Sequence, residues 1–384
     1  MALELTPLAT LPPAVDRACG PKAPPPMRLM AARGLAPLGP ADLLTALYQL
    51  GVSDDATLKS AAMKTALELP EKILGGALGE KLDARVLDFF ARRVWQKPKL
   101  LSIVLYNAAT DDETFRHLAT LCREDELEII AHNQERLLRS PGIIAALYMN
   151  PKTRMSTVQR AVELAVRNQV RVEGIPLFDE TAKAIASSGA LTPEQAAAED
   201  AAFKRAAEVA IDPAVGLSLT PLDEKEAEAL AEAAAEKAEA EAEATEAEVE
   251  EKKQRLVDLN ATSKIRAATL GNAFARAVLI RDTNKQVAMA CIRSPAVTDS
   301  EAMRYAMNRS LDDEVIRYIA NNRQWTRLHG IKVALCNNPK CPIPVSMRLL
   351  PHLGLRDLKS LARSKGIPSA LANAAKQILQ SRSA

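Results

Sequence analysis

The sequence IAHNQERLLRSPGIIAALYMNPKTRMSTVQRAVELAV, residues 130–166, has a counterpart later in the chain, IANNRQWTRLHGIKVALCNNPKCPIPVSMRLLPHL, residues 319–353. Both begin with Ile-Ala-x-Asn and continue in an apolar helical pattern to Ala-Leu. Both then break at Asn-Pro-Lys and resume a helical pattern with an arginine nine residues after the proline, at Arg160 and Arg348. The chain therefore uses one helix-break-helix pattern at least twice.

A third, looser copy surrounds Pro295 and places Arg304 in the same register. Pro295 and Pro339 are 44 residues apart, and a period of this size is typical of stacked helical hairpins. Aromatic residues make up only 3% of the chain, and alanine and leucine, which favour helix, fill the apolar positions instead. Alternating strand patterns and Asn-Gly turns are scarce. We predict an all-α fold, an irregular helical-repeat α-solenoid.

Charge is unevenly distributed along the chain. The formal net charge is +2, yet residues 223–253 hold 13 acidic and 4 basic residues, which leaves +11 on the remainder. This asymmetry favours either an acidic partner, nucleic acid included, or an ordinary mixed surface with one acidic insert. The insert is nearly all Ala, Glu and Lys without an apolar stripe, so it is predicted to be a solvated helix or a disordered spacer.

Four segments follow from these patterns. Residues 1–40 contain nine prolines and are predicted to form an extended, disordered tail, because each proline removes a backbone donor. Residues 41–190 form an N-terminal helical-repeat arm, and residues 191–258 an acidic Ala/Glu-rich insert or linker. Residues 259–384 are predicted to form a C-terminal helical-repeat arm. Within it, residues 264–280 are predicted to form one amphipathic helix, and Thr298-x-x-Glu301 is predicted to be the capping box of a later helix.

Five scattered cysteines favour a reducing compartment over a disulfide framework. No apolar run approaches the ~18 residues of a membrane span, and the N-terminus has no signal-peptide pattern. A cytoplasmic protein is therefore expected.

The break Ala334-Leu335-x-Asn337-Asn338-Pro339-x-x-Pro342 resembles α-helical repeats of the HEAT kind. More narrowly, it is similar to the leucine-rich-variant repeat, whose unit carries an Asn-Pro break, and Ala146-Leu147-x-x-Asn150-Pro151 matches the same break. The resemblance covers residues 100–166 and 264–379 and implies a fold, not an activity. The iron–sulfur cysteine cluster of one leucine-rich-variant protein has no counterpart, because the N-terminal region offers only Cys19.

One group of residues has the composition of a zinc site: His329, Cys336, Cys341 and His352 lie within 24 residues. Zinc takes four such ligands. In the repeat alignment, however, Cys336 occupies the position of Tyr148 and Ile292, which favours small buried cysteines. No metal or other cofactor is predicted.

Two further groups are candidates for binding. Arg160, Arg304 and Arg348 could form a basic row for phosphate or carboxylate. They could instead form an internal ladder that satisfies helix-end carbonyls or an Asp of the neighbouring repeat, and the resemblance to HEAT repeats, which use Arg–Asp ladders, implies the ladder. Arg323, Trp325 and Arg327 could stack on bases, although a tryptophan in an amphipathic helix is more often part of the core. Asparagines at the breaks are interpreted as turn formers.

No phosphate loop, nucleophile elbow, metalloprotease motif or dinucleotide fingerprint occurs in the sequence. We therefore expect a non-enzymatic scaffold or adaptor that binds another protein. The alternative is a nucleic-acid-binding protein, or a helical-repeat DNA-repair enzyme, that uses the basic surface outside the insert. Steep salt dependence would distinguish the nucleic-acid binder.

Overall fold

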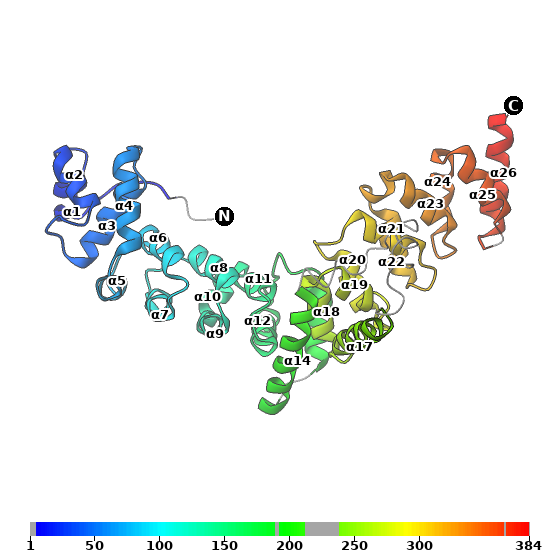
Figure 1. Cartoon of the computed structure of the whole chain (residues 1–384), viewed down its shortest axis with the longest axis horizontal. Coiled ribbons are helices and arrows are strands. Elements are labelled where there is room, and N and C mark those ends of the chain that lie inside the picture. The colour runs from blue at the N-terminus through cyan, green and yellow to red at the C-terminus, as the bar shows by residue number, and fades with distance from the viewer. Residues whose placement is uncertain (1–4, 189–191, 212–237, 365, 384) are drawn as a thin grey trace. The chain divides into compact units, whose positions relative to one another are not determined.

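The computed structural model describes residues 5–188, 192–211, 238–364 and 366–383. Every regular element in these ranges is a helix, and none is a strand, so the all-α prediction is confirmed. Contacts divide the chain into two compact units, Met1–Ile175 and Pro176–Ala384. Figure 1 shows the order of the helices along the chain.

The first unit consists of short helices, each of which packs on its near neighbours in the sequence. They are α1 (Pro13–Cys19), α2 (Pro25–Ala32), α3 (Pro40–Gly51), α4 (Ala56–Glu68), α5 (Glu71–Leu78), α6 (Ala84–Val94), α7 (Pro98–Tyr106), α8 (Asp112–Leu121), α9 (Glu124–His132), α10 (Gln134–Arg139), α11 (Gly142–Met149) and α12 (Met155–Arg167).

The second unit is also helical throughout its described residues. Its helices are α13 (Phe178–Ser188), α14 (Pro193–Ile211), α17 (Ala238–Val257), α18 (Ala261–Leu270), α19 (Ala273–Leu279), α20 (Lys285–Arg293), α21 (Asp299–Met307), α22 (Asp313–Asn321), α23 (His329–Asn337), α24 (Ile343–Leu349), α25 (Leu355–Arg363) and α26 (Ser369–Ser383), with 3-10 turns η1 (Trp325–Arg327) and η2 (Leu350–His352).

The prediction of a disordered tail over residues 1–40 is wrong, because α1 and α2 form there. Pro13 and Pro25 are the first residues of these helices, where a missing backbone N–H costs nothing and the fixed φ suits the helix. Val15 and Ala31 are completely buried, and both helices pack on α3. Prolines that were interpreted as helix breakers thus begin helices.

The predicted single helix over residues 264–280 is in fact two helices, α18 and α19. The break lies at Gly271–Asn272, where the Asn272 side chain accepts a hydrogen bond from the Ala275 N–H and caps α19. The Asn272 backbone N–H donates to the Ala210 carbonyl at 2.5 Å. The break therefore docks the start of α19 on the end of α14.

The unit boundary also differs from the predicted segments. Helix α13 was assigned to the N-terminal arm and α14 to the insert, but both pack against α18 and belong to the second unit. Helix α14 begins at a reciprocal N-terminal contact, in which the Thr192 N–H donates to Gln195 Oε1 at 2.9 Å and the Gln195 N–H donates to Thr192 Oγ1 at 3.3 Å. Because these helices contain acidic residues, their contact with α18 was not predicted.

Residues 223–237 of the acidic insert lie outside the described residues. Of the Ala/Glu-rich stretch 223–253, residues 238–253 belong to α17, which lies beside α14 and α19. Its side chains from Glu248 to Glu251 are exposed, whereas Leu256 is completely buried. The described part of this helix thus packs through its C-terminal end.

A repeated polar contact, which we name the asparagine clasp, joins the ends of neighbouring helices in the first unit. The side-chain amide of Asn150, at the end of α11, donates to the carbonyls of Ala119 and Cys122 at the end of α8, at 2.8 and 3.2 Å. Asn107, at the end of α7, donates to the Leu78 and Glu80 carbonyls at 2.7 and 2.8 Å. Each clasp satisfies carbonyls that a helix end leaves without partners.

The second unit repeats the clasp. Asn338, at the end of α23, donates to the Ala306 and Asn308 carbonyls at 2.8 and 3.1 Å, and its Oδ1 accepts from the Lys340 N–H at 3.0 Å. At the third break Ser294 takes the asparagine's place, and its hydroxyl donates to the Thr269 carbonyl at 2.9 Å. The predicted turn formers thus also connect one helix to another.

Candidate functional site

The four zinc candidates do not come together. Cys336 and Cys341 are buried, while His329 and His352 are exposed. His329 Nε2 lies 3.0 Å from Asp357 Oδ2, and Cys336 Sγ lies 3.7 Å from the Ser346 carbonyl. Within the ranges that the structure describes, no three His, Cys, Asp or Glu side chains are grouped as metal ligands.

All five cysteines are buried. Burial is the main reason that the pKa of Cys122 and the pKa of Cys336 each rise to about 12. We therefore expect the thiols of the folded protein to react slowly with a disulfide reagent at about pH 8, because the thiolate is the reactive form. In guanidinium, which unfolds the protein, the same titration should detect all five thiols rapidly. Rapid labelling of the native protein would contradict this.

Of the three recurring arginines, only Arg160 makes a ladder-like ion pair with a neighbouring helix. Arg160, on α12, is 59% exposed and pairs with Glu128 of α9 at 2.7 Å. Arg304, on α21, and Arg348, on α24, are exposed and have no ion pair or hydrogen bond to the described residues. Other polar side chains, the clasps among them, satisfy the helix-end carbonyls, so Arg304 and Arg348 remain available to a ligand.

Trp325 is not available for stacking. Its side chain is only 8% exposed, and its ring meets the ring of Tyr318 edge-on at 6.1 Å between centroids. The guanidinium of Arg293 covers Tyr318, 5.2 Å from the ring centroid. Arg323 and Arg327, in contrast, are exposed. The predicted base-stacking cluster is thus an aromatic pair inside the fold with arginines around it.

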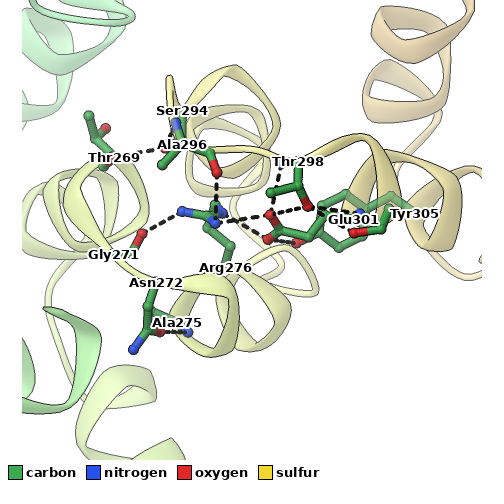
Figure 2. A network of polar contacts seen from close by, with 11 residues as sticks. Thr269, Gly271, Asn272, Ala275, Arg276, Ser294, Ala296, Thr298, Glu301 and Tyr305 are labelled. Carbon is green, nitrogen blue, oxygen red and sulfur yellow. Dashed lines mark hydrogen bonds and ion pairs between the residues drawn. The ribbon is translucent and has the colours of Figure 1, made fainter. Parts of the chain in front are cut away.

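A buried ion pair of the second unit lies at the centre of one closed network (Figure 2). Arg276 donates to both carboxylate oxygens of Glu301 at 3.0 Å, and the two side chains are 3% and 2% exposed. Arg276 also donates to the carbonyls of Gly271 and Ala296. Glu301 completes the predicted capping box with Thr298. Every group here has a partner, so the network stabilises the fold instead of offering a site.

The distribution of charge along the chain indicates a candidate site in residues 259–384, which we name the cationic segment. It contains 20 Lys and Arg but only 7 Asp and Glu, a net of +13, whereas Met1–Ile175 carries +2. Four of the acidic residues pair with Lys264, Arg276, Lys285 and Lys340. Few carboxylates therefore remain to neutralise the other cations.

Ten cations of this segment are exposed and have neither an ion pair nor a hydrogen bond to any described residue. They are Arg281, Arg304, Arg317, Arg323, Arg327, Arg348, Arg356, Lys359, Arg363 and Lys376.

Helix α25 carries the densest group of these cations. Arg356, Lys359 and Arg363 are spaced three and four residues apart, which places them on one face of the helix. Leu358 and Leu361, on the other face, are completely buried. We name these three cations the α25 row. The α25 row was not predicted, although the pattern LRDLKSLAR separates leucines from cations at helical spacing.

No known protein family, curated protein or solved structure matches this chain. None of the described helices combines the length and the apolar character that crossing a membrane requires. The cationic segment is therefore interpreted from its own geometry.

Proposed function

We propose that this protein is a non-enzymatic scaffold that holds an anionic partner on the cationic segment of its second unit. The observation that carries the proposal is the set of exposed cations without partners in a segment of net charge +13. Exposed like charges repel one another and weaken the compact state. An anionic partner would remove this repulsion, and binding would gain free energy that the isolated chain lacks.

The repeat pattern supports a scaffold. Stacked helical pairs of the leucine-rich-variant or HEAT kind present extended surfaces, and such surfaces suit a long partner. In the cationic segment the clasps of Ser294 and Asn338 hold neighbouring helices at their ends. A rigid frame of this kind keeps surface cations at constant spacing, which lowers the entropy that binding must overcome.

Retention on immobilised heparin, a generic polyanion, tests this function. The full-length protein should bind at low salt and elute only at raised salt, because attraction between exposed charges is screened. The variant Arg356→Gln/Lys359→Gln/Arg363→Gln should elute at distinctly lower salt. A matched variant in the first unit, Lys59→Gln/Lys64→Gln/Lys72→Gln, has the same net charge and should elute close to the wild type. Equal elution of the two variants would show that only net charge matters and would refute the proposed surface.

A further inference from the structure

We infer that the anionic partner is a nucleic acid, held by its phosphates with little preference for sequence. This inference rests on the proposed function and names the partner's chemical class. The cations occur on five of the elements from α21 to α25, at Arg304 on α21, Arg317 on α22, Arg327 on η1, Arg348 on α24 and the α25 row. A single acidic patch on a folded protein meets only a few such charges, whereas a nucleic acid carries charge along its whole length.

The spacing of the α25 row fits this partner. At 1.5 Å per residue, Arg356 and Arg363 are separated by about 10.5 Å along the helix axis. One strand of a duplex presents a phosphate roughly every 3.4 Å along its axis, so three cations face about three phosphates. Asp357 follows Arg356 directly and so does not share the face of the row, and its Oδ2 lies 3.0 Å from His329 Nε2.

The kind of cation also indicates phosphate. Eight of the ten cations without partners in the described residues are arginines, and two are lysines. The guanidinium is a planar fork of donors that binds two phosphate oxygens at once, whereas lysine acts as a point charge. A charged surface that served only solubility would not require arginine in preference to lysine.

The aromatic residues show why the bases themselves would not be recognised. The cationic segment has four aromatic rings, of which Phe274, Tyr305 and Trp325 are buried. Tyr318 is half-buried beneath Arg293. Stacking of unpaired bases needs exposed rings, and none of these four provides one. Contacts to phosphate fix position without reading sequence, so binding should be independent of sequence.

The test measures binding of the full-length protein to a mixed-sequence duplex of about 20 base pairs, across a range of salt concentrations. The slope of log K against log salt reports the number of phosphates engaged. The variant Arg356→Gln/Lys359→Gln/Arg363→Gln should reduce that slope by about 3 and weaken binding on the order of a hundredfold at 0.1 M salt. The first-unit variant Lys59→Gln/Lys64→Gln/Lys72→Gln should leave the slope unchanged, and scrambling the duplex sequence should change affinity less than about threefold.

Polyglutamate of matched charge serves as the competing acidic partner. Tighter binding of polyglutamate than of duplex, or an unchanged slope in the α25 variant with native circular dichroism, would overturn the inference. Retention on heparin without binding to the duplex would refute the inference that the partner is a nucleic acid, but it would not refute the proposed scaffold function. Failure to bind heparin, duplex and polyglutamate would refute both proposals.

Discussion

Replacing Glu301 by glutamine is expected to destabilise the second unit by about 3–5 kcal/mol, because Arg276 would remain buried with its charge uncompensated. The two side chains are 3% and 2% exposed, so water cannot replace the lost carboxylate. For a unit of this size the loss corresponds to a fall in melting temperature of roughly 10 °C. Thermal unfolding followed by circular dichroism, with amide exchange to locate the loss in α19–α21, measures it.

Two further variants make this result specific. Asp299→Asn changes an exposed acid on the same helix and should alter stability by no more than about 0.5 kcal/mol. Arg276→Met/Glu301→Leu removes both charges and should recover part of the loss, though not all, because the Gly271 and Ala296 carbonyls lose their donor. If Glu301→Gln were as mild as Asp299→Asn, the buried pair would have no stabilising role.

The same pair predicts how stability depends on pH. Burial acts to raise the pKa of Glu301, but hydrogen bonds from Arg276 and Thr298 outweigh it and hold the pKa below its ordinary 4.5. A group whose pKa is lower in the folded state stabilises the fold above its unfolded pKa and loses that contribution as pH falls through the folded value. The gap in stability between wild type and Glu301→Gln should therefore narrow below about pH 4.5.

Asn338→Ala is expected to cost about 2–4 kcal/mol, since it removes three side-chain hydrogen bonds and leaves two helix-end carbonyls without donors. The side chain is 3% exposed, so the carbonyls of Ala306 and Asn308 would not regain water easily. Denaturant unfolding of the full chain measures the loss.

Neighbouring substitutions control the clasp experiment. Asn337→Ala should cost well under half as much, because Asn337 is only half-buried and donates to Val333 within its own helix. Asn338→Ser should fall between wild type and alanine, since Ser294 forms a one-bond version of the clasp at the third break. Equal losses in Asn337→Ala and Asn338→Ala would mean that the inter-helix bonds carry no stability.

Local patterns in the sequence predicted that the described fold is helical, but they did not predict the long-range contacts between helices. The Asn-Pro breaks were predictable as turns because asparagine bonds its own backbone two residues on. The clasps were not, because the carbonyls that Asn150 and Asn338 reach lie 28–32 residues upstream. No feature near either asparagine specifies which earlier helix end will lie within hydrogen-bond distance.

The arginines show the same limit. Repeat register brought Arg304 and Arg348 to attention, and both are exposed. Arg276, in contrast, is buried on the short helix α19, which begins after the unpredicted break at Gly271–Asn272. An unpredicted helix boundary therefore changes the helix face on which a charged side chain is expected to lie.

The clasps also bear on how quickly the chain folds. Their donors and acceptors are 25–32 residues apart in sequence, so each closes a short loop whose entropic cost grows only slowly with length. Contacts of this range are local compared with the length of the chain, and local contacts favour rapid closure of each helix pair. Each pair of helices can form its own clasp before distant parts of the chain have folded.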